Sequence, residues 1–210
     1  MNASTPPANP PAPPLQFRAG RMAARELAAC EVPLLQALFD ANPLYFQAVN
    51  GRPPHADEAQ QEFDERPPPH LPFTRRWLLG LFDADVDSKA LQGVAVIVQD
   101  LCAPGVWHIA LYLVATALHG SGAAAGTYRA MEAWVRRGGA HWLRLGVVAG
   151  NARAERFWQA QGFAEVRRRG GIDTGGRVND LRVLAKPLAG GTLADYLVLV
   201  PRDQPDSVLP

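Results

Sequence analysis

The sequence predicts a mixed α/β domain, in which helices flank a mostly antiparallel sheet. An apolar run at Val106–Val114 is followed by a loop of small residues and then by helical spacing of apolar residues, which indicates a strand, a tight loop and a helix. Two apolar runs before this unit, at residues 77–82 and 91–100, are typical of an antiparallel meander. A strand, a helix and two further strands are predicted after it.

Composition divides the chain into three parts. Residues 1–14 contain six prolines and no charged residue, so we expect residues 1–15 to form a disordered tail. Residues 16–188 are expected to form the folded domain, because 210 residues suit one domain with a sizeable core. Residues 189–210 are a C-terminal extension.

The remaining elements follow from local patterns. Pro43 should break the first helix in two, and prolines from residue 67 onwards should end the short acidic helix before them. A candidate edge strand lies in the extension at 196–200. The expected elements outside the meander are, in order, strand 17–22, helix 32–49, helix 55–66, the helix after the loop, strand Trp142–Val148, helix 152–161, and strands 164–169 and 179–185.

Composition also excludes several classes of protein. The formal net charge is +1 and no apolar run approaches the eighteen or so residues that a membrane span needs, so we expect no membrane partner. The N-terminus lacks a signal-peptide pattern, which makes the cytoplasm the expected location. No basic stripe with interleaved aromatic residues is present, which argues against nucleic acid. Cys30 and Cys102 are too few for a disulfide framework.

The loop after Val114 has the features of an anion site. Gly120 and Gly122 leave the backbone open to a close approach, and a helix is expected to begin directly behind them. Its first amides and its positive dipole end would then point into the loop, where a phosphate or pyrophosphate would bind. The alternative is a tight turn between strand and helix with no ligand.

Two motifs extend this interpretation. The loop fits a Gln/Arg-x-x-Gly-x-Gly/Ala pattern through the residues His119, Gly120, Ser121, Gly122, Ala123 and Ala124. Residues 151–163, which follow a predicted strand, fit the pattern Asn-x-x-Ala-x-x-Phe-Tyr-x-x-x-Gly-Phe. With both motifs the chain resembles the GNAT family of N-acetyltransferases over about residues 75–187. Residues 42–59 resemble a segment of a bacterial branch of that family whose substrate is unassigned.

The resemblance implies a fold, a cosubstrate and a reaction. The strand before the loop should bulge and splay apart from its parallel neighbour, and residues 16–188 should form an acetyltransferase domain. The protein should move an acetyl group from acetyl-CoA directly to a primary amine, expected to be a small molecule, with no metal and no acyl-enzyme. The pantetheine arm should lie along Leu113 and Val114, with the pyrophosphate on the loop amides. Many relatives pair as dimers, which leaves a homodimer open.

The resemblance also points to catalytic residues. Several branches of the family place a catalytic Glu or His six residues before the position of Val114, where this chain has His108. Its unperturbed pKa near 6.5 suits a base at neutral pH, and strict alternation would place it on one strand face with Tyr112. The other reading of His108 is a histidine packed at a strand start. The family's usual acid, a tyrosine, is replaced by Trp158. Either the thiolate leaves unaided, or another tyrosine substitutes as the acid, with Tyr112 ranked before Tyr128.

The second motif adds cofactor contacts. Asn151 is expected to cap the helix that follows it and, by resemblance, to contact the pantetheine arm together with Phe157 and Trp158. His119 stands where Arg or Gln is usual and is expected to face solvent, which would remove a cation from the phosphate site. The arginines at 167–169 are expected to lie on an exposed strand.

Charge is distributed unevenly along the chain. Residues 40–100 carry ten acidic and five basic side chains, whereas residues 101–187 carry five acidic and twelve basic ones. This polarity favours an anionic cofactor on the second part and a cationic amine on the first, where Asp57 and Glu58 are candidate acceptor contacts. The alternative is chance segregation of surface charge.

Two other classes of function remain open at this point. One is a non-catalytic acyl-CoA binding or sensing module, which the missing tyrosine and the altered His119 favour. The other is a nucleotide-phosphate binder that uses the same loop. Release of free thiol from acetyl-CoA in the presence of an amine would distinguish the enzyme from both.

Overall fold

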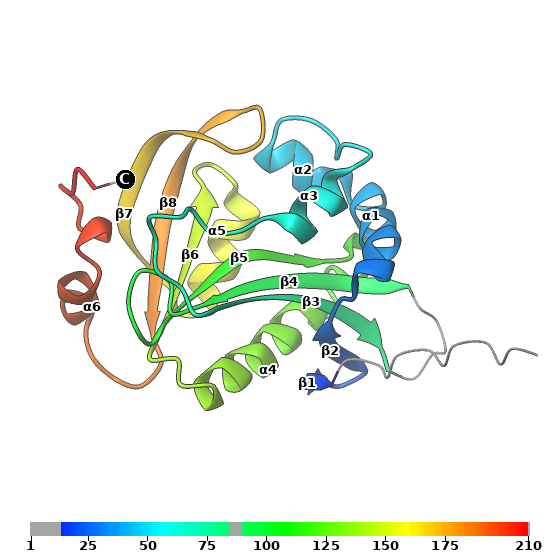
Figure 1. Cartoon of the computed structure of the whole chain (residues 1–210), viewed down its shortest axis with the longest axis horizontal. Coiled ribbons are helices and arrows are strands. Elements are labelled where there is room, and N and C mark those ends of the chain that lie inside the picture. The colour runs from blue at the N-terminus through cyan, green and yellow to red at the C-terminus, as the bar shows by residue number, and fades with distance from the viewer. Residues whose placement is uncertain (1–13, 85–89, 210) are drawn as a thin grey trace, which may run out of the picture.

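One eight-stranded sheet organises the molecule. The structure, a computed structural model, describes residues 14–84 and 90–209, and its strands follow the order β1-β2-β3-β4-β5-β6-β8-β7 (Figure 1). The strands are β1 (Leu15–Ala19), β2 (Met22–Glu26), β3 (Arg75–Asp83), β4 (Leu91–Gln99), β5 (Val106–Val114), β6 (Trp142–Val148), β7 (Ala164–Asp173) and β8 (Val178–Pro187). The helices are α1 (Val32–Asp40), α2 (Pro43–Val49), α3 (Glu58–Asp64), α4 (Ala123–Arg137), α5 (Ala152–Ala160) and α6 (Leu193–Leu199), with short 3-10 turns that include η3 (Pro201–Asp203).

The central pair, β5 and β6, is the parallel pair of this otherwise antiparallel sheet. The two strands pair from Val106 with Trp142 to Ile109 with Leu145. Beyond these residues both strands continue without pairing to each other, so their edges diverge. The predicted fold class, a mostly antiparallel sheet with a splayed parallel pair, is therefore confirmed.

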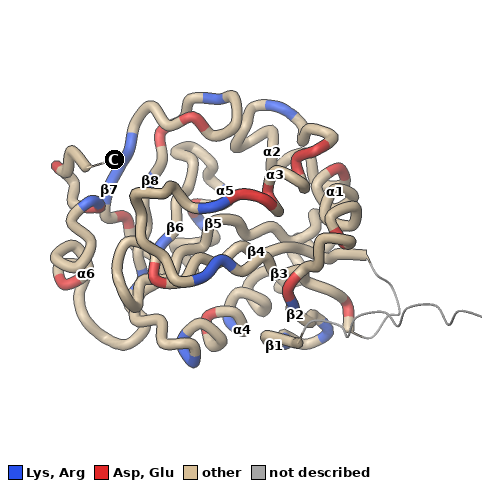
Figure 2. Tube along the Cα trace, viewed as in Figure 1, with Lys and Arg blue, Asp and Glu red and all other residues tan. Residues whose placement is uncertain are grey.

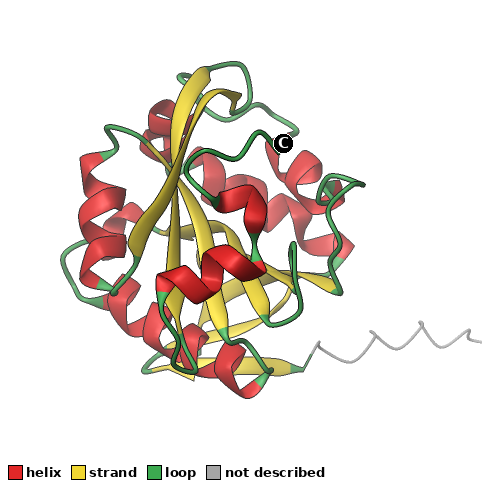
Figure 3. Ribbon diagram, turned by 90° about the vertical axis from the view of Figure 1, so that its left-hand side faces the viewer, coloured by secondary structure: helices red, strands yellow, loops and turns green. Residues whose placement is uncertain are grey.

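Helices cover both faces of the sheet (Figures 1 and 3). The core between the sheet and α4 and α5 includes Tyr128, Met131 and Trp158. The core on the opposite face packs α1, α2 and α3 against β3, β4 and β5. A third cluster, around Trp142 and Tyr196, holds α6 against β6 and β8.

Two elements differ from the sequence prediction. The expected strand at 17–22 is a hairpin, because Gly20, with φ of +57°, forms a two-residue turn with Arg21 between β1 and β2. The candidate edge strand at 196–200 is wrong, because this segment lies mainly in helix α6. Thr192 and Asp195 form a capping box that begins the helix.

The other elements agree with the prediction. The helix expected at 32–49 is broken at Pro43 into α1 and α2, and β5 and β6 have the predicted bounds. Residues 1–13 of the expected tail, and residues 85–89 between the first two strands of the meander, lie outside the described residues. Among the helices of the described chain, none combines the length and the apolar character required to cross a bilayer.

Candidate active site

A cleft of about 800 Å³ opens where β5 and β6 diverge. Its walls include the unpaired parts of both strands, the start of α5 and residues of the segment 40–75. Gly146 on β6 is exposed in this opening, where an added Cβ would meet only Leu181 at 4.0 Å. The cleft connects the two faces of the sheet at its centre.

A β-bulge at Ala110 decides which side chains meet in the cleft. Ile109 of β5 pairs with Ile97 of β4, and Leu111 pairs with the adjacent Val96, so Ala110 is the extra residue. The bulge reverses the alternation of side chains. Tyr112 packs against the core of α4 and α5, whereas His108 points to the opposite face, toward Arg144. The predicted common face of His108 and Tyr112 is therefore wrong, although both line the cleft.

The loop before α4 offers unpaired backbone donors. Gly120 and Gly122 both have φ of +82°, and an added Cβ at either would meet no atom within 4 Å. Among the described residues, none accepts a hydrogen bond from the amides of Gly120, Gly122, Ala124 or Ala125. These amides and the N-terminal end of the 15-residue helix α4 form a cradle for an anion. Side chains do not fill this bend.

The edge of β5 that faces the cleft carries a polar contact. The carbonyl oxygen of Leu113 points toward Gly93 of β4, so the next carbonyl, that of Val114, points away from β4. A ring nitrogen of His119 lies 3.0 Å from this oxygen. The side chain of His119 is exposed, as expected, and one of its ring nitrogens also bonds the strand edge.

The second motif forms the start of α5. The side chain of Asn151 accepts a hydrogen bond from the amide of Ala154 at 3.2 Å, which confirms the predicted N-cap. Phe157 lines the cleft and stacks on Tyr112 with ring centroids 6.0 Å apart. Trp158 is 7% exposed and packs against Tyr128 and Phe163, so it is mainly a core residue.

Tyr112 connects the cleft to the anion cradle. Its hydroxyl donates a hydrogen bond to the carbonyl oxygen of Ala124, at 2.7 Å. Burial raises the pKa of Tyr112, which keeps the phenol protonated at neutral pH. Tyr128, the other candidate acid, donates to Glu132 at 2.6 Å and does not line the cleft.

His108 differs in its electrostatics from the sequence prediction. Its Nδ1 lies 3.3 Å from a terminal nitrogen of Arg144. A guanidinium can only donate, so Nδ1 is the acceptor and the proton of the neutral ring is on Nε2. Burial and the positive charge of Arg144 lower the pKa of His108 to about 3. The expected pKa near 6.5 is wrong for this environment, and the ring presents an N–H donor to the cleft.

Arg144 is held by the C-terminal extension. Its Nε and Nη2 donate to the two carboxylate oxygens of Asp203, at 2.7 and 2.9 Å. Tyr196 of α6 donates to the same carboxylate at 2.5 Å, and Arg144 and Asp203 are both buried. Although burial opposes ionisation, the hydrogen bonds and charge of Arg144 hold the pKa of Asp203 below its ordinary value. Sequence reasoning missed this network because its members are far apart in the chain.

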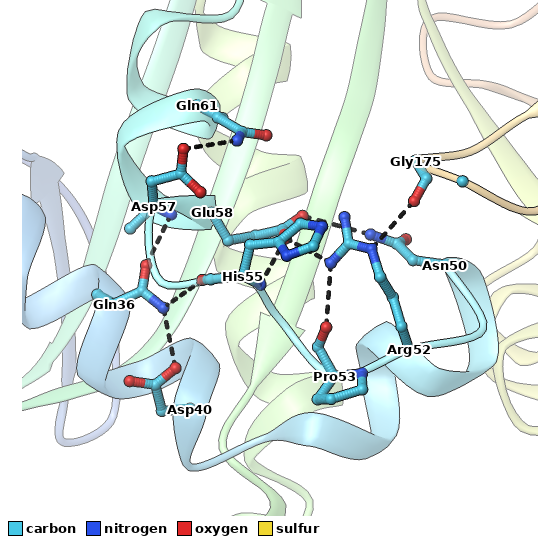
Figure 4. Close-up of polar contacts among 12 residues, drawn as sticks. Gln36, Asp40, Asn50, Arg52, Pro53, His55, Asp57, Glu58, Gln61 and Gly175 are labelled. Carbon is cyan, nitrogen blue, oxygen red and sulfur yellow. Dashed lines mark hydrogen bonds and ion pairs between the residues drawn. The ribbon is translucent and has the colours of Figure 1, made fainter.

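The charged residues that line the cleft are mainly basic. This differs from the expectation that acidic residues of the segment 40–100 would receive a cationic amine. Among the described residues that line it, Glu65 is the one carboxylate, against six arginines: Arg66, Arg76, Arg144, Arg153, Arg169 and Arg202. Asp57 and Glu58 do not line the cleft. Asp57 bonds Gln61, and Glu58 forms an ion pair with Arg52 at 2.9 Å (Figure 4).

The β7–β8 hairpin closes one end of the cleft against α2. Arg52, which follows α2, also donates through Nε to the carbonyl oxygen of Gly175 at 3.2 Å (Figure 4). Thr174 and Asn179 both donate to the carbonyl oxygen of Val49, at 2.7 and 2.8 Å. Contacts between segments more than 120 positions apart thus hold this wall in place.

The low pKa of His108 predicts a pH-dependent stability. Below pH 6.5 the unfolded chain protonates this histidine while the folded chain does not, so folding stability falls as the pH drops from 6.5 toward 3. His108→Gln keeps an acceptor for Arg144 and removes the titration. Between pH 7.5 and 4.5, the free energy of unfolding of the wild type should fall by about 2.5 kcal/mol relative to that of the variant. Urea unfolding at both pH values measures this difference, and a constant difference would contradict the assignment.

The comparisons with known proteins agree with this geometry. The sequence profile of the acetyltransferase (GNAT) family matches residues 35–163. The structure has the features expected of an acetyltransferase of this family: an open mixed sheet, a splayed parallel strand pair, and a glycine-lined bend before a helix. The chain belongs to the GNAT acetyltransferase family. A search of curated proteins returned no significant sequence match.

Several solved structures have a similar fold. An acetyltransferase from Thermus thermophilus superimposes with a TM-score of 0.62 at 22% identity, over 80% of this chain and 97% of its own. A spermidine N-acetyltransferase from Vibrio cholerae, in complex with CoA and spermine, gives 0.60 at 17% identity over 80% and 96%. A Salmonella typhimurium acetyltransferase described as modifying the N-terminal serine of a ribosomal protein gives 0.60 at 14% over 80% and 95%.

Proposed function

We propose that this protein is an N-acetyltransferase that moves the acetyl group of acetyl-CoA directly to a primary amine. The observation that carries the proposal is the conjunction of the open β5 edge with an anion cradle at its end. One extended molecule with a diphosphate could occupy both features. The amine would reach the same opening from the part of the cleft that the segment 40–75 lines.

The proposed cosubstrate site uses mainly backbone groups. The pantetheine arm would lie along the free edge of Leu113 and Val114, and an amide of the arm would compete with His119 for the Val114 carbonyl. The pyrophosphate would accept hydrogen bonds from the unpaired loop amides, those of Gly120, Gly122 and Ala124. Asn151, Phe157 and Trp158 would contact the arm from α5. Nothing in this proposed site requires a metal ion.

The proposed chemistry is direct transfer. The nitrogen of the neutral amine attacks the thioester carbon, the C–N bond forms, and the C–S bond breaks as the thiolate leaves. Because His108 has a low pKa and its Nδ1 is engaged by Arg144, we assign removal of the amine proton to water. We propose Tyr112 as the proton donor to the thiolate, since it lines the cleft in its protonated form.

A coupled assay tests the proposal. The protein is mixed with acetyl-CoA and a panel of alkylamines, polyamines, amino acids and amino-acid amides, and both free thiol and acetylated product are measured from pH 6 to 9. We expect free thiol and acetylated product in equal amounts. The pH dependence of the rate should show no ionisation near pH 6.5. Tyr112→Phe should lower kcat about 100-fold at unchanged CoA affinity. Tyr128→Phe, the matched control outside the cleft, should keep a near wild-type kcat.

A non-catalytic acyl-CoA binding module is the second candidate. Two observations favour it: Trp158 stands where the family's tyrosine is usual, and His108 has a pKa unsuited to a base. Calorimetry separates the candidates. CoA binding without thiol release for any amine would support the module, whereas a failure to bind CoA would contradict both.

A further inference from the structure

Arginines converge on the face of the cleft that is remote from α4 and α5. Arg169 on β7 pairs with Leu181 on β8, and Leu181 pairs with Val148 on β6, so the three side chains share one face of the sheet. Arg144 lies on this face too, because it is four positions before Val148 along β6. Arg202 of η3 lines the same cleft. Figure 2 shows the basic residues of β7 beside the C-terminal segment.

The charges of these arginines are not all compensated. The buried carboxylate of Asp203 neutralises Arg144. Arg167 donates hydrogen bonds to the backbone carbonyls of Arg202 and Ser207 and thereby ties β7 to the extension. Arg169 has neither a hydrogen bond nor an ion pair with any described residue, although it lines the cleft and is half-buried. Burial, and after it the nearby charges of Arg202, Arg167 and Arg144, lower its pKa.

We infer that the amine acceptor also carries an anionic group, a carboxylate or a phosphate, and that Arg169 binds this group. The inference rests on the proposed function and names its substrate class. A guanidinium matches both anions in shape and charge, through two parallel N–H donors. Nε2–H of His108, which no described residue accepts, adds a neutral donor elsewhere in the same cleft.

The layout of the cleft gives this acceptor a direction. Leu181 and Val183 of β8 form an apolar floor between Arg169 and the open edge of β6. An acceptor that lays a short apolar linker on this floor places its anion at Arg169 and its amine at the opening beside Gly146. The acceptor class is therefore an amino acid or an aminoalkyl phosphate. Polyamines, which lack an anion, would leave Arg169 without a partner.

Matched acceptors test the inference. β-Alanine, γ-aminobutyrate and ethanolamine phosphate are compared with propylamine, butylamine and ethanolamine. We expect kcat/KM at least tenfold higher for the anionic member of each pair, and the carboxylate and phosphate arms identify which anion is preferred. Arg169→Ala should lower the ratio of kcat/KM for the anionic acceptor to kcat/KM for its neutral partner by about 10- to 100-fold, because hydrogen bonds to charged groups are of this strength. CoA affinity should not change.

Controls and a binding measurement keep the two proposals separate. Arg168→Ala removes the adjacent, largely exposed arginine, which pairs with Glu165, and should leave the preference intact. In parallel, calorimetry on CoA-saturated protein compares N-acetyl-β-alanine with N-propylacetamide. Tighter binding of the anion in the wild type but not in Arg169→Ala supports the inference even if no amine is turned over. Equal binding and equal kcat/KM within each pair, or loss of CoA affinity in Arg169→Ala, would overturn it and leave the acetyltransferase proposal standing.

Discussion

Replacing Asp203 by alanine is expected to lower the free energy of unfolding by about 3–5 kcal/mol. The carboxylate is fully buried and accepts hydrogen bonds from Arg144 and Tyr196. Its removal leaves the guanidinium of Arg144, which is itself only 6% exposed, without a counter-ion. A buried, uncompensated charge is among the most costly defects in a folded protein. Urea unfolding at pH 7.5 measures the loss.

Two further variants separate the charge from the packing. Tyr196→Phe removes one hydrogen bond and keeps the ion pair, so it should cost only about 1 kcal/mol. The double variant Arg144→Met with Asp203→Leu removes both charges and should recover most of the loss of the single variant. If Asp203→Ala cost no more than Tyr196→Phe, the ion pair would not be the interaction that holds the extension to β6.

Local patterns predicted the central elements well. The bounds of β5 and β6 follow from apolar runs that lie between turn residues, and the break at Pro43 follows from the missing amide of proline. The glycines at 120 and 122 marked the anion cradle because positive φ at those positions leaves few other residue types. These features depend on the residues within one segment, which a single sequence contains.

The catalytic geometry could not be predicted in the same way. The resemblance implies a bulge in β5, but its position at Ala110 is visible only in the pairing of β4 with β5, and it reverses every face assignment on one side of it. Strict alternation therefore placed His108 beside Tyr112. The pKa of His108 depends on Arg144, which is 36 residues away, and on the burial that the whole sheet produces. Neither the position of the bulge nor the pKa of His108 can be inferred from neighbouring residues in the sequence.

The C-terminal extension carries one local signal for its helix. Thr192 followed by Asp195 is a capping-box pattern, which predicts a helix start and would have replaced the edge strand at 196–200. The contact of Asp203 with Arg144 has no such signal. The arginines at 167–169 were expected on an exposed strand, whereas Arg167 bonds the extension and Arg169 lines the cleft. A run of like charges in the sequence therefore does not show that its members have different partners in the fold.

The anion cradle predicts the largest effect on binding. Ser121 lies between the two glycines, and its side chain is exposed at the edge of the anion cradle. Its hydroxyl donates a hydrogen bond to the carbonyl oxygen of Leu118. Ser121→Asp adds a negative charge beside the proposed pyrophosphate, and we expect the Kd for CoA to rise about 10- to 100-fold at low ionic strength. Ser121→Asn has the same shape without the charge and should change the Kd less than about threefold. Calorimetry at two salt concentrations measures both, and the effect of Asp should shrink as salt screens the charge. Equal affinities for Asp and Asn would place the diphosphate elsewhere, because a charge at this distance cannot be neutral toward an anion that the neighbouring amides bind.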